Sequence, residues 1–175
     1  MRAAAVLFVA LVLAGCGGGD GGSSADVPEG FRTLAGDGWT LAYPAGWEVS
    51  EVDGSRLAQG PKGESGLAPQ AAVARDTKPP PFDVSLEAFK SDQFVRRGNW
   101  KITRDAAFKL DGADEARVIE ADYIEKTTGG TTPVRTIDLL VRTQDGDQLD
   151  FLMRAPSADF DRVRLNEVLD TIRLK

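Results

Sequence analysis

The fold is decided by the stretch Val134-Arg135-Thr136-Ile137-Asp138-Leu139-Leu140-Val141-Arg142-Thr143-Gln144-Asp145-Gly146-Asp147-Gln148-Leu149-Asp150-Phe151-Leu152-Met153. Its odd-numbered positions are apolar in both halves, at Ile137, Leu139, Val141, Leu149, Phe151 and Met153. A period of two is typical of a β-strand with one buried face. The stretch therefore predicts two strands, over 134–143 and 147–155, joined by a tight turn.

The two apolar rows lie on one face of this hairpin in only one register. Thr143 must pair with Asp147, which leaves a three-residue loop that ends at Gly146. Such a loop needs a positive φ at its third position, where glycine is the favoured residue. Because a two-residue turn would place Phe151 opposite Leu140 instead, we predict the three-residue loop.

Periodicity in the rest of the chain predicts more strands and two helices. We expect strands over 39–43, 47–52, 70–76, 100–110 and 116–124, with a loop or a weak strand over 54–70. One helix should begin at a cap formed by Asp83 or Ser85, bury Leu86 and Phe89, and end at Gly98. A second should follow Ser157 and bury a stripe formed by Leu165, Val168, Leu169 and Ile172.

These elements predict an α+β fold. Strands that come in runs, rather than alternating with helices, are typical of that class. The strand over 100–110 has Trp100, Ile102, Ala106, Phe108 and Leu110 at one parity, so they should share a face. The strand over 116–124 is apolar on both faces, which indicates a sheet covered on both sides. We expect a central antiparallel sheet of about six or seven strands flanked by helices.

The segment Trp39-Thr40-Leu41-Ala42-Tyr43-Pro44-Ala45-Gly46-Trp47 carries a family resemblance. An aromatic residue, an alternating strand and Tyr-Pro-x-Gly-Trp resemble the N-terminal hairpin of the PsbP-like superfamily, including its small actinobacterial-type lipoproteins. The resemblance implies an α/β/α sandwich and a protein that assists assemblies or binds other proteins. It supplies no catalytic residues.

A second resemblance lies near the N-terminus. The apolar run of residues 3–13 follows one positive charge and is too short for a bilayer-spanning helix, which needs about 20 residues. The tetrapeptide Leu13-Ala14-Gly15-Cys16 after it resembles the lipobox of bacterial lipoproteins, which are cut before the cysteine and lipidated on it. This implies a signal peptide over 1–15, a lipid anchor on Cys16 and a location on the extracytoplasmic face of the cell membrane.

Composition then divides the chain. Residues 17–24 are glycine, serine and one aspartate, so 16–26 should be a lipidated cysteine with a flexible tether, and 27–175 a single PsbP-like globular domain. The chain has 21 basic and 27 acidic residues, a formal net charge of −6, which disfavours nucleic acid as a partner. Cys16 is the only cysteine, so no disulfide can form within the chain.

Most catalytic chemistry is excluded by the residues that the sequence lacks. It has no histidine, so a serine–histidine–acid triad and a histidine-based metal site cannot form. Asp145, Asp147 and Asp150 resemble a calcium loop, but the position that needs glutamate is Pro156. We therefore expect no enzyme, no metal and no cofactor.

One local cluster could bind a partner. Arg96, Arg97 and Trp100 combine cationic and aromatic side chains around Gly98, a set that can hold an anionic or peptide partner. The leading hypothesis is a membrane-anchored, non-catalytic module that binds or assembles envelope proteins. Two alternatives stay open: a carrier or sensor of a small apolar ligand held between sheet and helix, and a hydrolase that uses carboxylates alone.

Overall fold

The computed structural model describes residues 27–97, 99–127 and 130–175. Its main element is a seven-stranded sheet in the order β3-β4-β5-β9-β8-β7-β6, in which all neighbours are antiparallel. The bounds are β3 Glu48–Val52, β4 Ser55–Gln59, β5 Gln70–Asp76, β6 Lys101–Ala107, β7 Ala113–Thr127, β8 Gly130–Thr143 and β9 Gln148–Pro156. This confirms the expected antiparallel sheet and its size.

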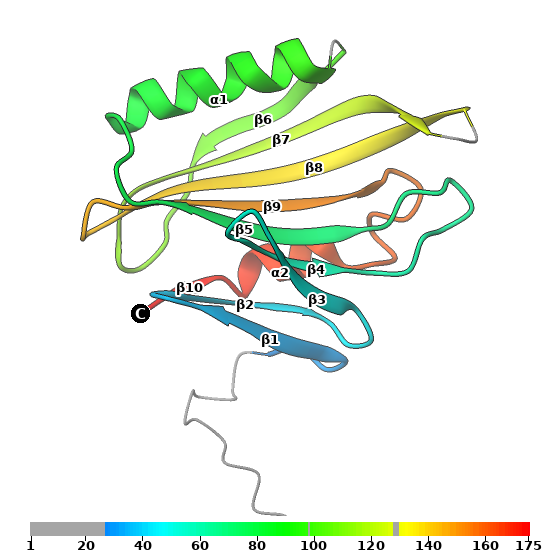
Figure 1. Ribbon diagram of the computed structural model, residues 1–175, viewed down its shortest axis with the longest axis horizontal. Helices are drawn as coiled ribbons and strands as arrows, with labels where there is room; N and C mark the ends of the chain where they lie inside the picture. The colour runs from blue at the N-terminus through cyan, green and yellow to red at the C-terminus, as the bar shows by residue number, and fades with distance from the viewer. Residues whose placement is uncertain (1–26, 98, 128–129) are drawn as a thin grey trace, which may run out of the picture.

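A helix and a small sheet cover the two faces of the large sheet (Figure 1). Helix α1 (Phe82–Arg97) lies along one face. A three-stranded sheet, in the order β1-β2-β10, lies on the other face together with the short helix α2 (Leu165–Asp170). Its bounds are β1 Phe31–Gly36, β2 Trp39–Pro44 and β10 Arg173–Leu174. The expectation of helices on both faces of the sheet is thus only partly confirmed, because strands cover most of the second face.

The hairpin of β8 and β9 has the predicted register. Val141 pairs with Leu149, and the backbone N–H of Thr143 donates to the carbonyl of Asp147 at 2.9 Å. Gly146 has φ +87°, as the third residue of the three-residue loop requires. The three-residue loop is confirmed, and with it the assignment of the apolar row to one face.

The expected hairpin between residues 39–43 and 47–52 is wrong. The chain does turn at Gly46, which has φ +89°, but the two strands enter different sheets. β2 pairs with β1 and β10, whereas β3 pairs with β4. The partner β1 precedes β2 and is joined to it by Asp37-Gly38, a dipeptide typical of hairpin turns.

The expectation that Trp100, Ile102, Ala106, Phe108 and Leu110 share one face is also wrong. The pairing of β6 with β7 shifts between Ile102 and Arg104, which is a β-bulge at Thr103. One extra residue reverses the alternation of side chains. Trp100 therefore packs on the α1 side of the sheet, while Ala106, Phe108 and Leu110 pack on the side of the small sheet.

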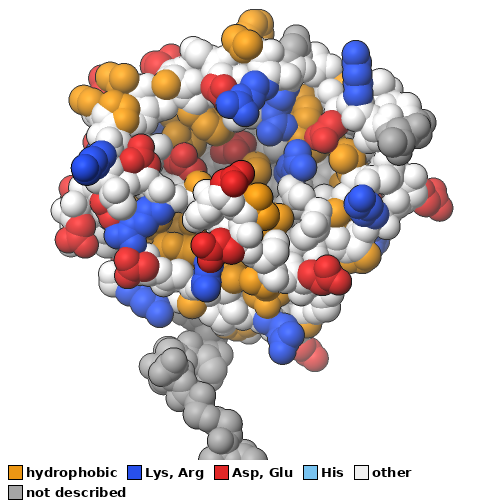
Figure 2. Space-filling model, viewed as in Figure 1, with side chains coloured by type: hydrophobic (Ala, Val, Ile, Leu, Met, Phe, Trp, Pro, Cys, Tyr) orange, Lys and Arg blue, Asp and Glu red, His pale blue; other side chains and the backbone are white. Residues whose placement is uncertain are grey.

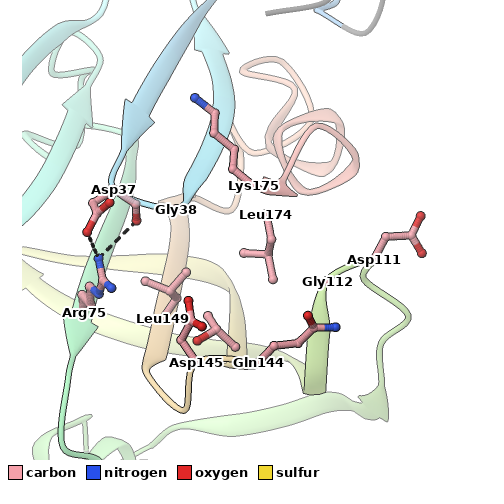
Figure 3. A pocket seen from close by; sticks show the side chains of 11 residues that line it. Asp37, Gly38, Arg75, Asp111, Gly112, Gln144, Asp145, Leu149, Leu174 and Lys175 are labelled. Atoms are coloured by element: carbon pink, nitrogen blue, oxygen red, sulfur yellow. Dashed lines mark hydrogen bonds and ion pairs between the residues drawn. The ribbon is translucent and has the colours of Figure 1, made fainter.

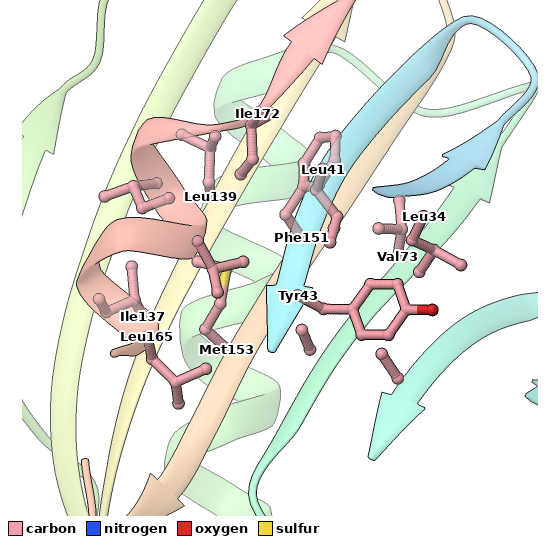
Figure 4. Close-up of a cluster of buried hydrophobic side chains, with 14 of the residues drawn as sticks. Leu34, Leu41, Tyr43, Val73, Ile137, Leu139, Phe151, Met153, Leu165 and Ile172 are labelled. Carbon is pink, nitrogen blue, oxygen red and sulfur yellow. The ribbon is translucent and has the colours of Figure 1, made fainter. Parts of the chain in front are cut away.

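Two hydrophobic clusters fill the spaces between the layers. The larger lies between the two sheets and α2, and Figure 4 shows side chains from β1, β2, β5, β8, β9 and α2 converging there. The smaller lies between α1 and the large sheet and contains Phe82, Leu86, Phe89, Trp100 and Ile119. Leu86 and Phe89 thus face the sheet, as predicted.

The ends of both helices differ from the expectation. α1 begins at Phe82, which places Asp83 in its first turn rather than at a cap, and the expected end at Gly98 lies outside the described residues. α2 begins only at Leu165, after a run of turns over 157–164, but its predicted buried stripe is confirmed.

In the described part of the chain, no helix is long and apolar enough to cross a membrane. The predicted signal peptide over 1–15 and the predicted lipid attachment at Cys16 lie outside it.

Candidate functional site

The arginines predicted as part of a partner surface lie on the last turn of α1 and face different surroundings. Arg96 is exposed and its guanidinium pairs with Asp92 at 2.6 Å. The guanidinium of Arg97 lies over the ring of Tyr123, 3.9 Å from its centroid, and its Nε donates to Gln93 at 2.6 Å. Arg97 is therefore a packing residue between α1 and the sheet, and Arg96 faces solvent.

The third predicted residue, Trp100, is buried beside α1. Its ring stands edge-on to that of Phe89, with 6.1 Å between the centroids. Its Nε1 is buried and has no hydrogen-bond partner among the described residues. The structure thus does not bring the three side chains onto one common surface, and their joint role as a partner site stays a prediction.

Trp100 does border an apolar groove between the end of α1 and the start of β6. The groove has a volume of about 440 Å³ and is lined by Lys90, Ser91, Phe94, Val95, Trp100 and Ile102. Phe94 is 63% exposed, Val95 79% and Ile102 38%. Figure 2 shows hydrophobic side chains projecting over α1 at the top of the molecule. Contiguous exposed apolar side chains of this kind are typical of interaction sites.

Sequence reasoning missed Phe94, Val95 and Ile102 as site residues. The sequence does hold a signal for the first two. Leu86 and Phe89 already supply the buried stripe of α1, so Phe94 and Val95, five or six positions past Phe89, fall on other sides of the helix. For Ile102 the signal is its shared parity with Trp100, which holds because both residues precede the bulge at Thr103.

A buried carboxyl lies on the same face of the sheet as α1. Asp138 on β8 pairs with Ile119, a member of the cluster beneath α1. Burial raises the pKa of Asp138 to about 7, while a hydrogen bond with Thr136 and the charges of Arg97 and Arg154 oppose the shift. Half of the Asp138 carboxyls are therefore protonated near neutral pH.

The polar groups near Asp138 bind one another. Arg154 donates to Gln70 at 2.7 Å and to Glu125 at 3.3 Å, and the hydroxyl of Tyr123 donates to Glu125 at 3.0 Å. Burial raises the pKa of Tyr123, so this hydroxyl stays protonated. The network links β5, β7 and β9 and serves to hold the sheet together under α1.

A second cleft lies where the two sheets meet and is shown in Figure 3. It has a volume of about 460 Å³, with Leu149 and Leu174 as apolar lining and Asp111 and Asp145 as acids. Arg75 lies at one side of it, and its guanidinium forms ion pairs with Asp37 and Asp147. The charge of Arg75 is thus compensated within the chain, and we assign the cleft a structural role.

The carboxylates available for hydrolysis are all exposed or half-buried: Asp111, Asp114, Glu115, Glu120, Asp122 and Glu125. Three of them pair with arginines: Glu120 with Arg104, Asp122 with Arg135 and Glu125 with Arg154. Within 27–97, 99–127 and 130–175, no three acidic side chains come together as a metal site would require.

The fold and groove define the class only broadly, as a sheet-rich domain with an apolar surface beside one helix. No protein-family model matches the chain, and no curated protein matches it either. Among solved structures, the chain is similar to PA94 of Pseudomonas aeruginosa, a protein of unknown function, with a TM-score of 0.50 and 10% identity over 75% of this chain and 87% of that one. At this identity the similarity shows the fold alone.

A second solved structure is LpqN of Mycobacterium tuberculosis, which is involved in cell envelope biogenesis. It covers 85% of this chain and 80% of its own, with 11% identity and a TM-score of 0.45. That TM-score is too low to support an inference about this chain.

Proposed function

We propose that the protein is a non-catalytic module, anchored to the extracytoplasmic face of the cell membrane, that binds another protein through the groove between α1 and β6. The observation that carries this proposal is the exposure of Phe94 and Val95 in a groove that buried Trp100 also lines. Water contact with such side chains is unfavourable, at about 25 cal/mol per Å² of apolar surface, and a bound protein would relieve it.

The anchor is proposed from the sequence. Leu13-Ala14-Gly15-Cys16 supports lipidation of Cys16. The residue pattern from Trp39 to Trp47 supports a PsbP-like lipoprotein, although its two strands enter different sheets. β1 begins at Phe31 on the side of the molecule opposite α1 (Figure 1). The chain from 16 to 30 can span at most about 50 Å. A tether of this length, attached on the side of β1, leaves α1 accessible to a protein.

The structure gives the carrier alternative no support. A ligand held between sheet and helix needs a cavity, but Leu86, Phe89, Trp100 and Ile119 pack together in that space. The hydrolase alternative needs two acids that converge in one cleft. Asp111 and Asp145 line the cleft between the sheets, but the Asp111 carboxyl points away from Asp145 (Figure 3), and Glu120, Asp122 and Glu125 pair with arginines. Binding is the function that the geometry favours.

The anchor is tested by Cys16→Ser in cells. We expect the protein to incorporate labelled fatty acid and to sediment with membranes, and we expect Cys16→Ser to lose both properties. Unlabelled protein, or a Cys16→Ser variant that sediments as before, would contradict the anchor.

The binding surface is tested by a photoreactive phenylalanine analogue at position 94, with the same probe at exposed Thr33 on β1 as the matched control. We expect adducts of one defined mass from position 94 and none from position 33. Val95→Asp should reduce the adduct at least tenfold, because a charge at the groove opposes burial. Equal adducts from both positions, or none from position 94, would sink the proposed surface.

A further inference from the structure

We propose that the protein bound at this surface is a second copy of the chain, with the two α1 helices packed antiparallel; this rests on the proposed function. The exposed side of α1 carries Val84, Ala88, Ser91 and Val95, spaced by four, three and four residues. That spacing forms one line along a helix and matches the apolar seam of paired helices. Val84 is 51% exposed and stands at the opposite end of the line from Val95.

The line is symmetric about its midpoint. In an antiparallel pair, Val84 meets Val95 of the second copy and Ala88 meets Ser91 of the second copy, and both contacts occur twice. The bulky residues lie at the ends and the small ones at the centre, so two helices can approach to the usual 8–10 Å at their midpoint. The groove and Phe94 lie directly beside this contact and extend it.

Charge favours the antiparallel arrangement. The first turn of α1 carries Asp83 and the last turn carries Arg96 and Arg97. Antiparallel packing places the acidic turn of one copy beside the basic turn of the other, and it also opposes the two helix dipoles. Parallel packing would place like charges together.

Two other occupants fit less well. An added strand would have to pair with β6, whose outer edge carries Lys101, Arg104 and the bulge at Thr103, features that discourage strand pairing. The chain's own segment 17–24 consists of glycine, serine and aspartate and has nothing apolar to place in the groove. A helix with the complementary charge order is the better occupant, and α1 itself has that order.

The contact is small, so it should depend on the anchor. A helix of 16 residues is about 24 Å long, and one face of it falls below the roughly 800 Å² per partner of a standard interface. Such pairs are weak in dilute solution. Attachment of both copies to one membrane raises their local concentration and makes the same contact effective.

Cysteine crosslinking of the anchored protein in intact cells tests the pairing. Cys16 is the only natural cysteine, so Ser91→Cys adds one reactive site at the proposed midpoint, and Ser50→Cys on exposed β3 is the matched control. With a short bismaleimide, we expect at least tenfold more dimer from Ser91→Cys than from Ser50→Cys. Val95→Asp in the Ser91→Cys background should remove that excess.

A change of the crosslinking position tests the direction of packing. In the antiparallel pair the two copies of residue 84 lie about 17 Å apart along the helices, at 1.5 Å per residue, so Val84→Cys should give at least threefold less dimer than Ser91→Cys. Equal crosslinking of Ser91→Cys and Ser50→Cys would overturn the pairing, and as much dimer from Val84→Cys as from Ser91→Cys would overturn its antiparallel direction. If Ser91→Cys gives no dimer while the probe at position 94 captures a different protein, the self-pairing is wrong and the proposed function is supported. If neither position reacts, both proposals are wrong.

Discussion

The carboxyl of Asp138 makes the stability of the fold depend on pH. Its folded pKa of about 7 lies above the ordinary value of 3.8, so the folded state binds more protons than the unfolded state between these values. The free energy of unfolding therefore falls as pH rises through this window. Above pH 7 the full free-energy cost of burying the charged carboxylate is present. Below pH 3.8 both states are protonated and the cost disappears.

Asp138→Asn should remove this cost. We expect the variant to be more stable than the wild type at pH 8, by up to about 4 kcal/mol at 1.36 kcal/mol per pKa unit, and nearly equal to it at pH 4. Urea unfolding at both pH values measures the difference, with Asp161→Asn at an exposed site as the control. A difference that is the same at both pH values would show that Asp138 is not the titrating group.

Thr171 joins the small sheet to α2 through one hydroxyl. The buried hydroxyl accepts a hydrogen bond from the backbone N–H of Ala42 at 2.8 Å and donates to the carbonyl of Val168 at 2.7 Å. Thr171→Val keeps the shape but leaves the N–H unpaired, so we expect a loss of about 1–3 kcal/mol in the free energy of unfolding. Thr33→Val on exposed β1 should change it by less than about 0.5 kcal/mol; an equal loss in both variants would contradict the assignment.

Single residues also show where sequence reasoning reaches its limit. Gly146 could be assigned its positive φ because the apolar rows on both sides of it allow one register only. Trp100 could be named as a site residue, but its burial beside Phe89 depends on how α1 lies on the sheet. Phe94 and Val95 become visible as a surface only once Leu86 and Phe89 are known to take the buried face.

Among the elements, the hairpin of β8 and β9 is the one fixed most firmly by its own sequence. Deletion of Asp150 would keep the loop but shift the later residues of β9 by one position, which moves Phe151 from Leu139 to Leu140. We expect the variant to lose cooperative thermal unfolding, as measured by circular dichroism.

Gly146→Ala is the milder control for that deletion. Nothing lies within 4 Å of an added Cβ there, so only the positive φ opposes the change, at a cost of about 1–2 kcal/mol. We expect this variant to unfold cooperatively at a lower temperature. If the Asp150 deletion behaved like Gly146→Ala, the hairpin would not depend on its register.

Other elements could not be placed from local pattern. β6 was expected to present one apolar face, but the bulge at Thr103 divides its side chains between two faces. A bulge is one residue in a strand of ordinary composition, and it is fixed by the partner strand rather than by β6 itself. β10 has only two residues, too few for any periodicity, and exists because β2 lies beside it.

At the scale of the whole molecule, the class and the large sheet could be predicted, while the arrangement of the layers could not. Runs of alternating strands indicate an antiparallel sheet wherever they occur, and apolar residues on both sides of β7 require two covered faces. Which elements cover them depends on long-range pairing. The second layer is built from β1, β2 and β10, which come from opposite ends of the chain.

That arrangement places the proposed membrane attachment, before β1, and the proposed binding surface, at α1, on opposite sides of the molecule. The chain enters the fold at β1, and α1 with its exposed apolar residues lies across the large sheet from it (Figure 1). An anchor attached through the first side leaves the second side available for a protein. If the proposal is right, α1 is covered by a bound protein in the cell envelope and exposed when the protein is alone.

Hydroxyl-radical footprinting tests this prediction most directly, by comparing the protein in intact envelopes with the same protein purified and diluted in detergent. We predict that oxidation of Phe94 and Val95 falls at least fivefold in the envelope, while exposed Val49 and Val52 on β3 react equally in both samples. If Phe94 and Val95 react as strongly in the envelope as in dilute detergent, α1 is not a binding surface and the central claim is wrong.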